Sequence, residues 1–147
     1  MRGYAIAVLF ILLLCTVSPA PAASENRYSY ITVDSIAINL SGTSANITVH
    51  YQLDSGATFI LFFLGKNDLR LKLEKILNYP GAQISSIDSD SATFAVRNVS
   101  YVYGDGIYWF PSHEFGMMIP NLTIHTPRVS RSYTNTSDFP NGIGYFA

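Results

Sequence analysis

The sequence predicts a mainly β protein of the α+β class, an antiparallel β-sheet or sandwich with one amphipathic helix packed on it. Residues 46–53 alternate between polar and apolar side chains, residues 58–64 are almost uniformly apolar, and residues 68–78 repeat apolar side chains at helical spacing. The chain has 147 residues, 48% of them hydrophobic, which is enough apolar surface for one ordered domain. We therefore expect a single β-rich domain over residues 30–147.

The first 22 residues have the order of a secretory signal peptide. Arg2 supplies a positive charge, residues 4–17 form an apolar run, and Ala20-Pro21-Ala22 is a small-x-small cleavage signal. We expect cleavage after Ala22, a polar lead-in over residues 23–29, and an extracellular or cell-surface location. The alternative is a signal kept as an anchor, although its apolar run is shorter than the roughly 20 residues that span a bilayer. No later segment is apolar over such a length.

Alternation predicts the first strands. Residues 36–40 and 46–53 each place apolar side chains on one face, and the turn-forming residues 41–44 join them. This pattern predicts an antiparallel hairpin with one face in water. Residues 58–64 are apolar on both faces, so we expect a buried strand at the centre of the sheet.

One helix is predicted from Asp68 to Asn78. Its apolar stripe consists of Leu69, Leu73, Ile76 and Leu77. Leu71 projects onto the polar side. We expect Asn67 or Asp68 to cap the start of the helix and Pro80-Gly81 to end it.

Short strands and turns are predicted for the rest of the chain. The expected strands are residues 83–88, 92–96, 107–110, 115–119 and 122–126. Gly104-Asp105-Gly106 is a tight-turn signal, and Pro120 separates the last two strands. The final twenty residues are rich in turn formers, but the apolar Tyr145-Phe146-Ala147 is expected to dock on the domain.

Asparagine-linked glycosylation is the modification that the sequence favours. Five Asn-x-Ser/Thr triplets occur, where chance predicts roughly 1.6. They begin at Asn39, Asn46, Asn98, Asn121 and Asn135. The same spacing arises where Asn and Thr occupy the wet face of a strand. In an exported protein both explanations hold together, because outward-facing Asn is accessible.

The sequence contains no recognisable catalytic, metal-binding or cofactor motif, so we expect a non-enzymatic protein. His50 and His125 are expected to face water and His113 to lie in a loop, without a shared site. The only cysteine, Cys15, leaves with the signal peptide. With 9 Lys+Arg against 10 Asp+Glu, no basic surface for nucleic acid is expected. The enzyme alternative is a small hydrolase that uses Asp105 and Glu114 as a carboxylate pair.

Aromatic residues gather late in the chain. Tyr108, Trp109 and Phe110 are consecutive on one predicted strand, so at least one ring faces outward unless a further layer covers it. Exposed Tyr103, Tyr108 and Trp109 would form a stacking platform for a glycan or a partner surface. The alternative is a core strand covered on both sides.

Two segments stand out beside the export signal and the sequon-bearing strands. They are Gly65-Lys66-Asn67-Asp68-Leu69 and Phe139-Pro140-Asn141-Gly142-Ile143-Gly144-Tyr145-Phe146. In these features the chain resembles small secreted or envelope proteins of unknown activity from methanogenic archaea. The resemblance implies a compartment, the cell envelope or its exterior, and no particular activity.

We therefore expect an exported protein that acts through its surface, in a structural or interaction role in the envelope. The alternatives are a carbohydrate-binding module with exposed aromatic rings and the small hydrolase. Self-association is expected at an unprotected sheet edge formed by a neutral polar row, Asn46, Thr48, His50 and Gln52. On this hypothesis Thr48→Lys relieves a concentration-dependent association.

Overall fold

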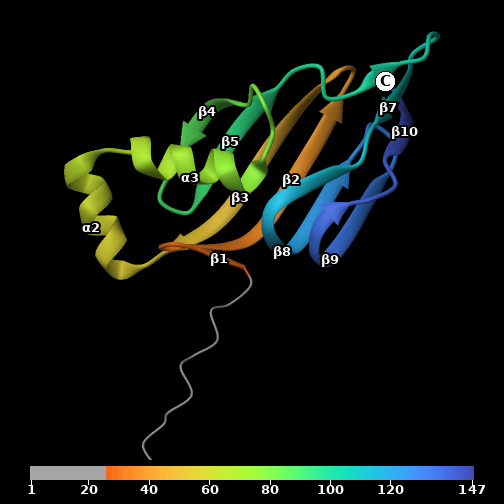
Figure 1. Ribbon diagram of the computed structural model, residues 1–147. Coiled ribbons are helices and arrows are strands. Elements are labelled where there is room, and N and C mark those ends of the chain that lie inside the picture. The colour runs from red at the N-terminus through yellow and green to blue at the C-terminus, as the bar shows by residue number, and fades with distance from the viewer. Residues whose placement is uncertain (1–25) are drawn as a thin grey trace, which may run out of the picture.

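The structure is a computed structural model that describes residues 26–147 (Figure 1). The predicted signal peptide and the first part of the lead-in lie outside these residues. In order, the elements are β1 (Arg27–Tyr28), β2 (Ile31–Ser41), β3 (Ser44–Leu53), α2 (Ser55–Leu64), α3 (Asn67–Leu77), β4 (Gln83–Ile87), β5 (Ser91–Val96), β6 (Tyr101–Val102), β7 (Ile107–Phe110), β8 (His113–His125), β9 (Ser130–Phe139) and β10 (Ile143–Phe146).

A seven-stranded sheet forms most of the molecule, in the order β4-β5-β3-β2-β8-β9 with the short β1 beside β2. Its neighbours are antiparallel except β2 and β8, which run parallel over residues 35–39 and 121–125. A second, antiparallel sheet has the order β10-β7-β6. The predicted mainly β class is thus confirmed, and the large sheet is mixed because of its one parallel pair.

The core lies on one face of the large sheet. Ile36, Ile47 and Val49 are buried there, whereas Asn46 and His50 on the opposite face are exposed. The predicted alternation and the β2–β3 hairpin are therefore confirmed. The helix α3 lies across the core face (Figure 1), and inward side chains of β7 and β10 belong to the same apolar cluster.

The helix α3 confirms the predicted helix and its faces. The buried side chains are those of the predicted stripe, and Leu71 on the polar side is 50% exposed. The predicted N-cap is wrong, because Lys66 holds that position and no side chain caps the helix there. Asn78 ends the helix in the left-handed conformation, with a φ of 54°.

The contact between α3 and β8 is closest at Gly116. A Cβ on Gly116 would lie 2.3 Å from the carbonyl oxygen of Lys75 and 3.4 Å from Cα of Ile76. Only a residue without a side chain lets the helix backbone rest this closely on the strand.

The predicted central strand over residues 58–64 is wrong, because these residues belong to the helix α2. A short apolar run has no periodicity that separates a helix from a buried strand. β3 has β2 on one side and β5 on the other, so no further strand from residues 58–64 can pair with it. Residues 26–147 thus contain two helices where one was expected, and α2 projects away from the sheet (Figure 1).

The late strands β8 and β9 also differ from the prediction. The chain continues through Pro120 as one strand. β8 begins to pair with β2 only at Asn121. On its other side, Ile119 and Asn121 pair with β9, and Pro120 between them does not. The missing N–H of Pro120 therefore interrupts neither ladder. β9 was not predicted, because most of its side chains on both faces are polar and exposed.

The open edges of the large sheet are β4 and β9, so the predicted edge at β3 is wrong. The outward row of β3 is solvated as expected, except that Thr48 is half-buried. β3 lies between β2 and β5, however, and Thr48→Lys therefore does not test strand addition. Both edges are irregular, since Asn135 in β9 has a φ of 49° and the β4–β5 register shifts between Ile84 and Ser86.

The C-terminal strand docks as predicted. β10 pairs with β7, and the buried Tyr145 donates its hydroxyl to the carbonyl oxygen of Gly42 at 2.6 Å. The turn signal at residues 104–106 joins β6 to β7, with Ile107 N–H bonded to the Gly104 carbonyl. Within residues 26–147, neither helix has the length and hydropathy needed to cross a bilayer.

Candidate functional site

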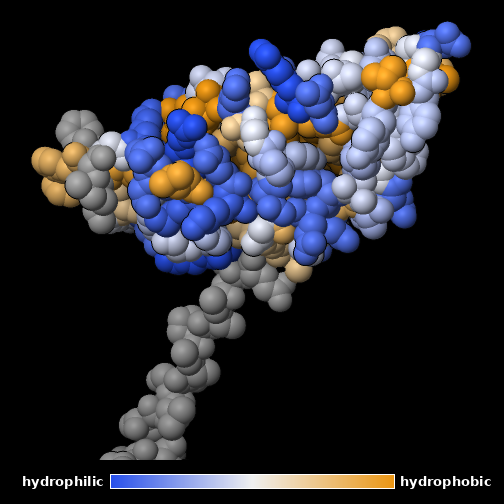
Figure 2. Space-filling model, turned by 45° about the horizontal axis from the view of Figure 1, so that its top comes forward, coloured by the Kyte–Doolittle hydropathy of each residue, from blue (hydrophilic) through white to orange (hydrophobic). Residues whose placement is uncertain are grey.

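The outer face of the second sheet carries a group of exposed aromatic and apolar side chains. Trp109 is in register with Tyr101, and Ile107 with Phe146, so the side chains stand in two cross-strand rows. We call this group the aromatic surface; it consists of Tyr101, Tyr103, Ile107, Trp109 and Phe146. Figure 2 shows apolar atoms, in orange, at the end of the molecule where these strands lie.

The indole of Trp109 lies against Gly142, the residue before β10, and against Gly144 within β10. A Cβ on Gly142 would come within 2.6 Å of Trp109 Cζ2, and a Cβ on Gly144 would lie 3.5 Å from Cε3. Gly142 therefore leaves space that the ring fills, whereas a Cβ at Gly144 would make an ordinary contact with the indole. Trp109 is still 39% exposed. A flat aromatic ring is thus fixed in place while part of its surface stays open to water.

Inward side chains hold the second sheet on the body of the protein. The Tyr145 hydroxyl lies 2.8 Å from the buried Ser100 Oγ, in addition to its bond to Gly42. Burial raises the pKa of Tyr145, so the hydroxyl keeps its proton. The ring of Tyr108 stacks on Tyr145 with centroids 5.6 Å apart. These contacts give the aromatic surface an ordered base.

The structure places the three predicted binding aromatics on two faces. Tyr103 and Trp109 lie on the aromatic surface, whereas Tyr108 is half-buried on the inner side of β7. Phe146 joins the surface only through the pairing of β10 with β7. Sequence reasoning missed Phe146, and it took Gly144 as a turn residue although Gly144 lies within β10. Gly142, just before β10, is a turn residue as predicted, with a φ of 61°.

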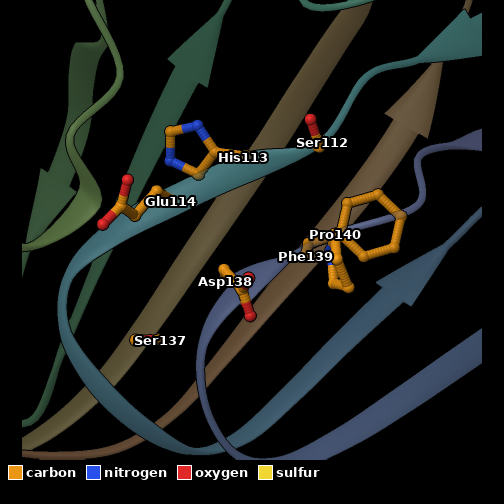
Figure 3. A pocket seen from close by; sticks show the side chains of 7 residues that line it. All are labelled: Ser112, His113, Glu114, Ser137, Asp138, Phe139 and Pro140. Atoms are coloured by element: carbon orange, nitrogen blue, oxygen red, sulfur yellow. The ribbon is translucent and has the colours of Figure 1, made fainter.

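An open groove of about 540 Å³ lies where the first residues of β8 face the end of β9 (Figure 3). Its lining is Ser112, His113, Glu114, Ser137, Asp138, Phe139 and Pro140. Glu114 and Asp138 are opposite each other in register, but in Figure 3 their carboxylates point apart. Asp138 instead accepts a bond from Thr136 Oγ1 at 3.2 Å.

The predicted carboxylate pair is not assembled in this groove. Asp105 lies in the β6–β7 turn and is not among the residues that line the groove beside Glu114. Across residues 26–147, no group of three or more His, Cys, Asp or Glu side chains is placed to hold a metal ion.

His113 begins β8 and is half-buried, so its predicted place in an exposed loop is wrong. Its ring stacks on Tyr79 with centroids 3.6 Å apart, and its Nε2 donates to the carbonyl oxygen of Leu77 at 2.7 Å. This histidine therefore ties the end of α3 to β8. His50 is exposed as predicted, and the half-exposed His125 bonds Ser130 Oγ through Nδ1 at 2.7 Å.

Burial lowers the pKa of His113 below its usual 6.5, against smaller opposing effects of the Leu77 carbonyl and Glu114. The unfolded chain therefore takes up a proton first as the pH falls, so His113 stabilises the fold above about pH 6.5 and loses that contribution below it. We expect the urea midpoint to drop between about pH 7.5 and about pH 5. His113→Gln should flatten this dependence. Equal slopes in the variant and the unsubstituted chain would contradict the assignment.

The five sequon asparagines are all exposed. Asn39, Asn46 and Asn121 lie on the outward face of the large sheet, where Asn39 and Asn46 are opposite each other in register. Asn98 and Asn135 have positive φ values of 57° and 49° and lie where the strands turn or kink.

Comparison with protein-family models, with curated proteins and with solved structures found no match to the chain. The function is therefore argued from the geometry of the site alone.

Proposed function

We propose that the chain is an exported, non-enzymatic binding protein of the cell surface or its exterior, and that it binds glycans through the aromatic surface. The single observation that carries the proposal is Trp109, whose indole packs against Gly142 and Gly144 with part of its surface open. A place in an archaeal cell envelope, which the resemblance implies, belongs to the same proposal, as does glycosylation at the exposed sequons.

The chemistry of the aromatic surface suits an uncharged sugar. A pyranose ring has an apolar C–H face that stacks on a flat indole, and its hydroxyl groups need polar partners at the rim. Tyr101 and Tyr103 supply phenol hydroxyls beside the ring, and none of the five residues carries a charge. The Arg128 guanidinium lies over the Phe146 ring, 5.5 Å from its centroid, and adds a donor for sugar hydroxyls at that side. Because β7 is paired on both sides and the indole of Trp109 already packs against Gly142 and Gly144, little conformational entropy is lost when a ligand binds.

A structural or interaction role in the envelope is a second candidate, which the outward face of the large sheet favours. In one cross-strand row, Thr93, Thr48, Ala37 and Thr123 are in register on four neighbouring strands. Such a neutral, hydroxyl-rich surface is suited to contact with another protein or a polysaccharide layer.

The first test is a glycan array probed with the exported protein. We expect binding to one class of neutral glycan and a loss of roughly ten-fold or more in affinity for Trp109→Ala, since truncating a central aromatic anchor of a binding site typically costs about 2 kcal/mol or more. Leu71→Ala, which removes an exposed apolar side chain from α3, is the matched control and should bind normally. Undiminished binding by Trp109→Ala, or no binding by the unsubstituted chain, would reject the glycan site.

A further inference from the structure

We propose that α2 is a membrane-contacting helix, which lies in the interfacial layer of a lipid bilayer with Phe59 and Phe63 inserted. The inference is independent of the glycan site, which lies at the opposite end of the molecule (Figure 1). It rests on the composition of α2, on its packing, and on the chain that precedes β1.

The composition of α2 is that of a helix covered by an apolar phase. Its ten residues include no charged side chain. Phe59 and Phe63 are 68% and 69% exposed, lie one turn apart, and have ring centroids 4.8 Å from each other. A helix that is apolar on all sides is normally buried, and each phenylalanine left in water forgoes the free energy of that burial.

The body of the protein covers α2 only in part. Ala57 is buried and Leu61 half-buried, but an apolar cavity of about 270 Å³ lies beneath the helix, against Leu53 and Leu69. The helix protrudes from the sheet in Figure 1, and Figure 2 shows apolar atoms at the same end. At about 15 Å in length it cannot cross a hydrocarbon layer of about 30 Å, so contact with a bilayer means lying along its surface.

The position of the N-terminal chain favours a membrane as the occupant. β1 is tied to the start of α2, because Arg27 pairs with Asp54, whose N–H donates to the Tyr30 carbonyl at 3.1 Å. Residues 18–26 join this point to the apolar run of residues 4–17 and span at most about 30 Å. In a chain that keeps its signal as an anchor, that run is in the membrane and α2 is within reach of the same surface. One short apolar anchor holds a protein only weakly on a membrane, and contact of α2 with the bilayer would strengthen that attachment.

The charge beside α2 favours anionic lipid through a net excess of two basic side chains. Residues 66–75, directly after the helix, contain four basic and two acidic side chains, but Arg70 pairs with Glu74 and Lys72 with Asp68. The net positive charge therefore rests on Lys66, which also donates to the Ile87 carbonyl oxygen, and on Lys75. Basic side chains close to a bilayer surface are attracted to negatively charged headgroups. Lys and Arg stems can also lie along the apolar layer while their charges stay in water.

The test uses the full chain in vesicles of phosphatidylcholine and anionic phosphatidylglycerol, with and without brominated acyl chains, which quench tryptophan on contact. The probe is Phe59→Trp in a Trp109→Phe background. We expect its emission to be blue-shifted and largely lost in the brominated vesicles. The matched control is the unsubstituted chain, whose only tryptophan, Trp109, lies at the far end and should keep its emission. Both chains share the same N-terminal run, so the difference reports on α2.

Three outcomes would overturn the inference. Equal emission of the Phe59→Trp chain in the two kinds of vesicle would mean that α2 does not contact lipid. A blue shift without vesicles, with a doubled mass in solution, would assign the helix to an interface with a second copy. A blue shift without vesicles in a monomer, lost when residues 1–22 are removed, would assign it to the chain's own N-terminal run. Phe63→Trp repeats the test at the neighbouring turn, in case the first probe alters the fold.

Discussion

We expect Leu73→Ala to lower the free energy of unfolding by about 2–5 kcal/mol. Leu73 is fully buried in the middle of α3, where the helix lies across the core face of the large sheet. Truncation to alanine loses the free energy gained by burying the leucine side chain. It also leaves a cavity, because the packed strands around it hold the core in place.

The control for this prediction lies on the same helix. Leu71, two residues earlier, is 50% exposed, so Leu71→Ala should change stability by less than about 0.5 kcal/mol. Urea denaturation of the two variants, followed by circular dichroism, gives both values. Similar midpoints for the two variants would mean that α3 does not pack on the sheet through the predicted stripe.

Gly116→Ala is expected to cost about 1–3 kcal/mol although it adds a single methyl group. That group would lie 2.3 Å from the Lys75 carbonyl oxygen, a backbone atom that can move only if α3 moves. The helix must then lift from β8, which loosens the packing of Ile76 and Leu77 together. The thermal midpoint should fall, and the contact of His113 with the end of α3 should weaken with it.

Gly56→Ala is the matched control for Gly116→Ala. Gly56 lies inside α2, has open space around its Cα, and has no positive φ. Alanine there should leave stability unchanged or raise it by up to about 1 kcal/mol, because it favours the helical backbone. If Gly116→Ala were as harmless as Gly56→Ala, the close approach of α3 to β8 would be refuted.

The parts of the fold that the sequence predicted well are those in which one periodicity persists along an element. β3 alternates over its whole length, and α3 holds four apolar residues on one stripe, so burial follows directly from spacing. α2 was mistaken for a strand because an apolar run without a polar face fits both. Pro120 was expected to end a strand. A proline disrupts a strand only where its missing N–H would have bonded to a neighbouring strand, and the sequence does not show which strands are neighbours.

The aromatic surface was predictable only in part. The run of Tyr108, Trp109 and Phe110 requires an outward ring, and Trp109 is that ring. Two other features depend on the pairing of β10 with β7, which are more than thirty residues apart in the chain. They are the place of Phe146 on this surface and the packing of the indole against Gly142 and Gly144. Such partners are set by tertiary pairing, which local pattern does not encode. The same reason explains why Glu114 is in register with Asp138 and is not paired with the predicted Asp105.

The parallel pairing of β2 with β8 has a consequence for the order in which the chain folds. β2 finds β3 through a tight hairpin, and β5 follows after the two helices, but the other side of β2 is completed only when residues near Asn121 pair with Ser35. Closing so long a loop is slow, so this side of β2 stays unpaired until the later part of the chain is in place. During that interval a half-built sheet presents the unpaired side of β2, with Ile36 and Ile38 incompletely covered. The arrival of β8 therefore sets the pace of folding and ends the period in which the new chain is open to mispairing.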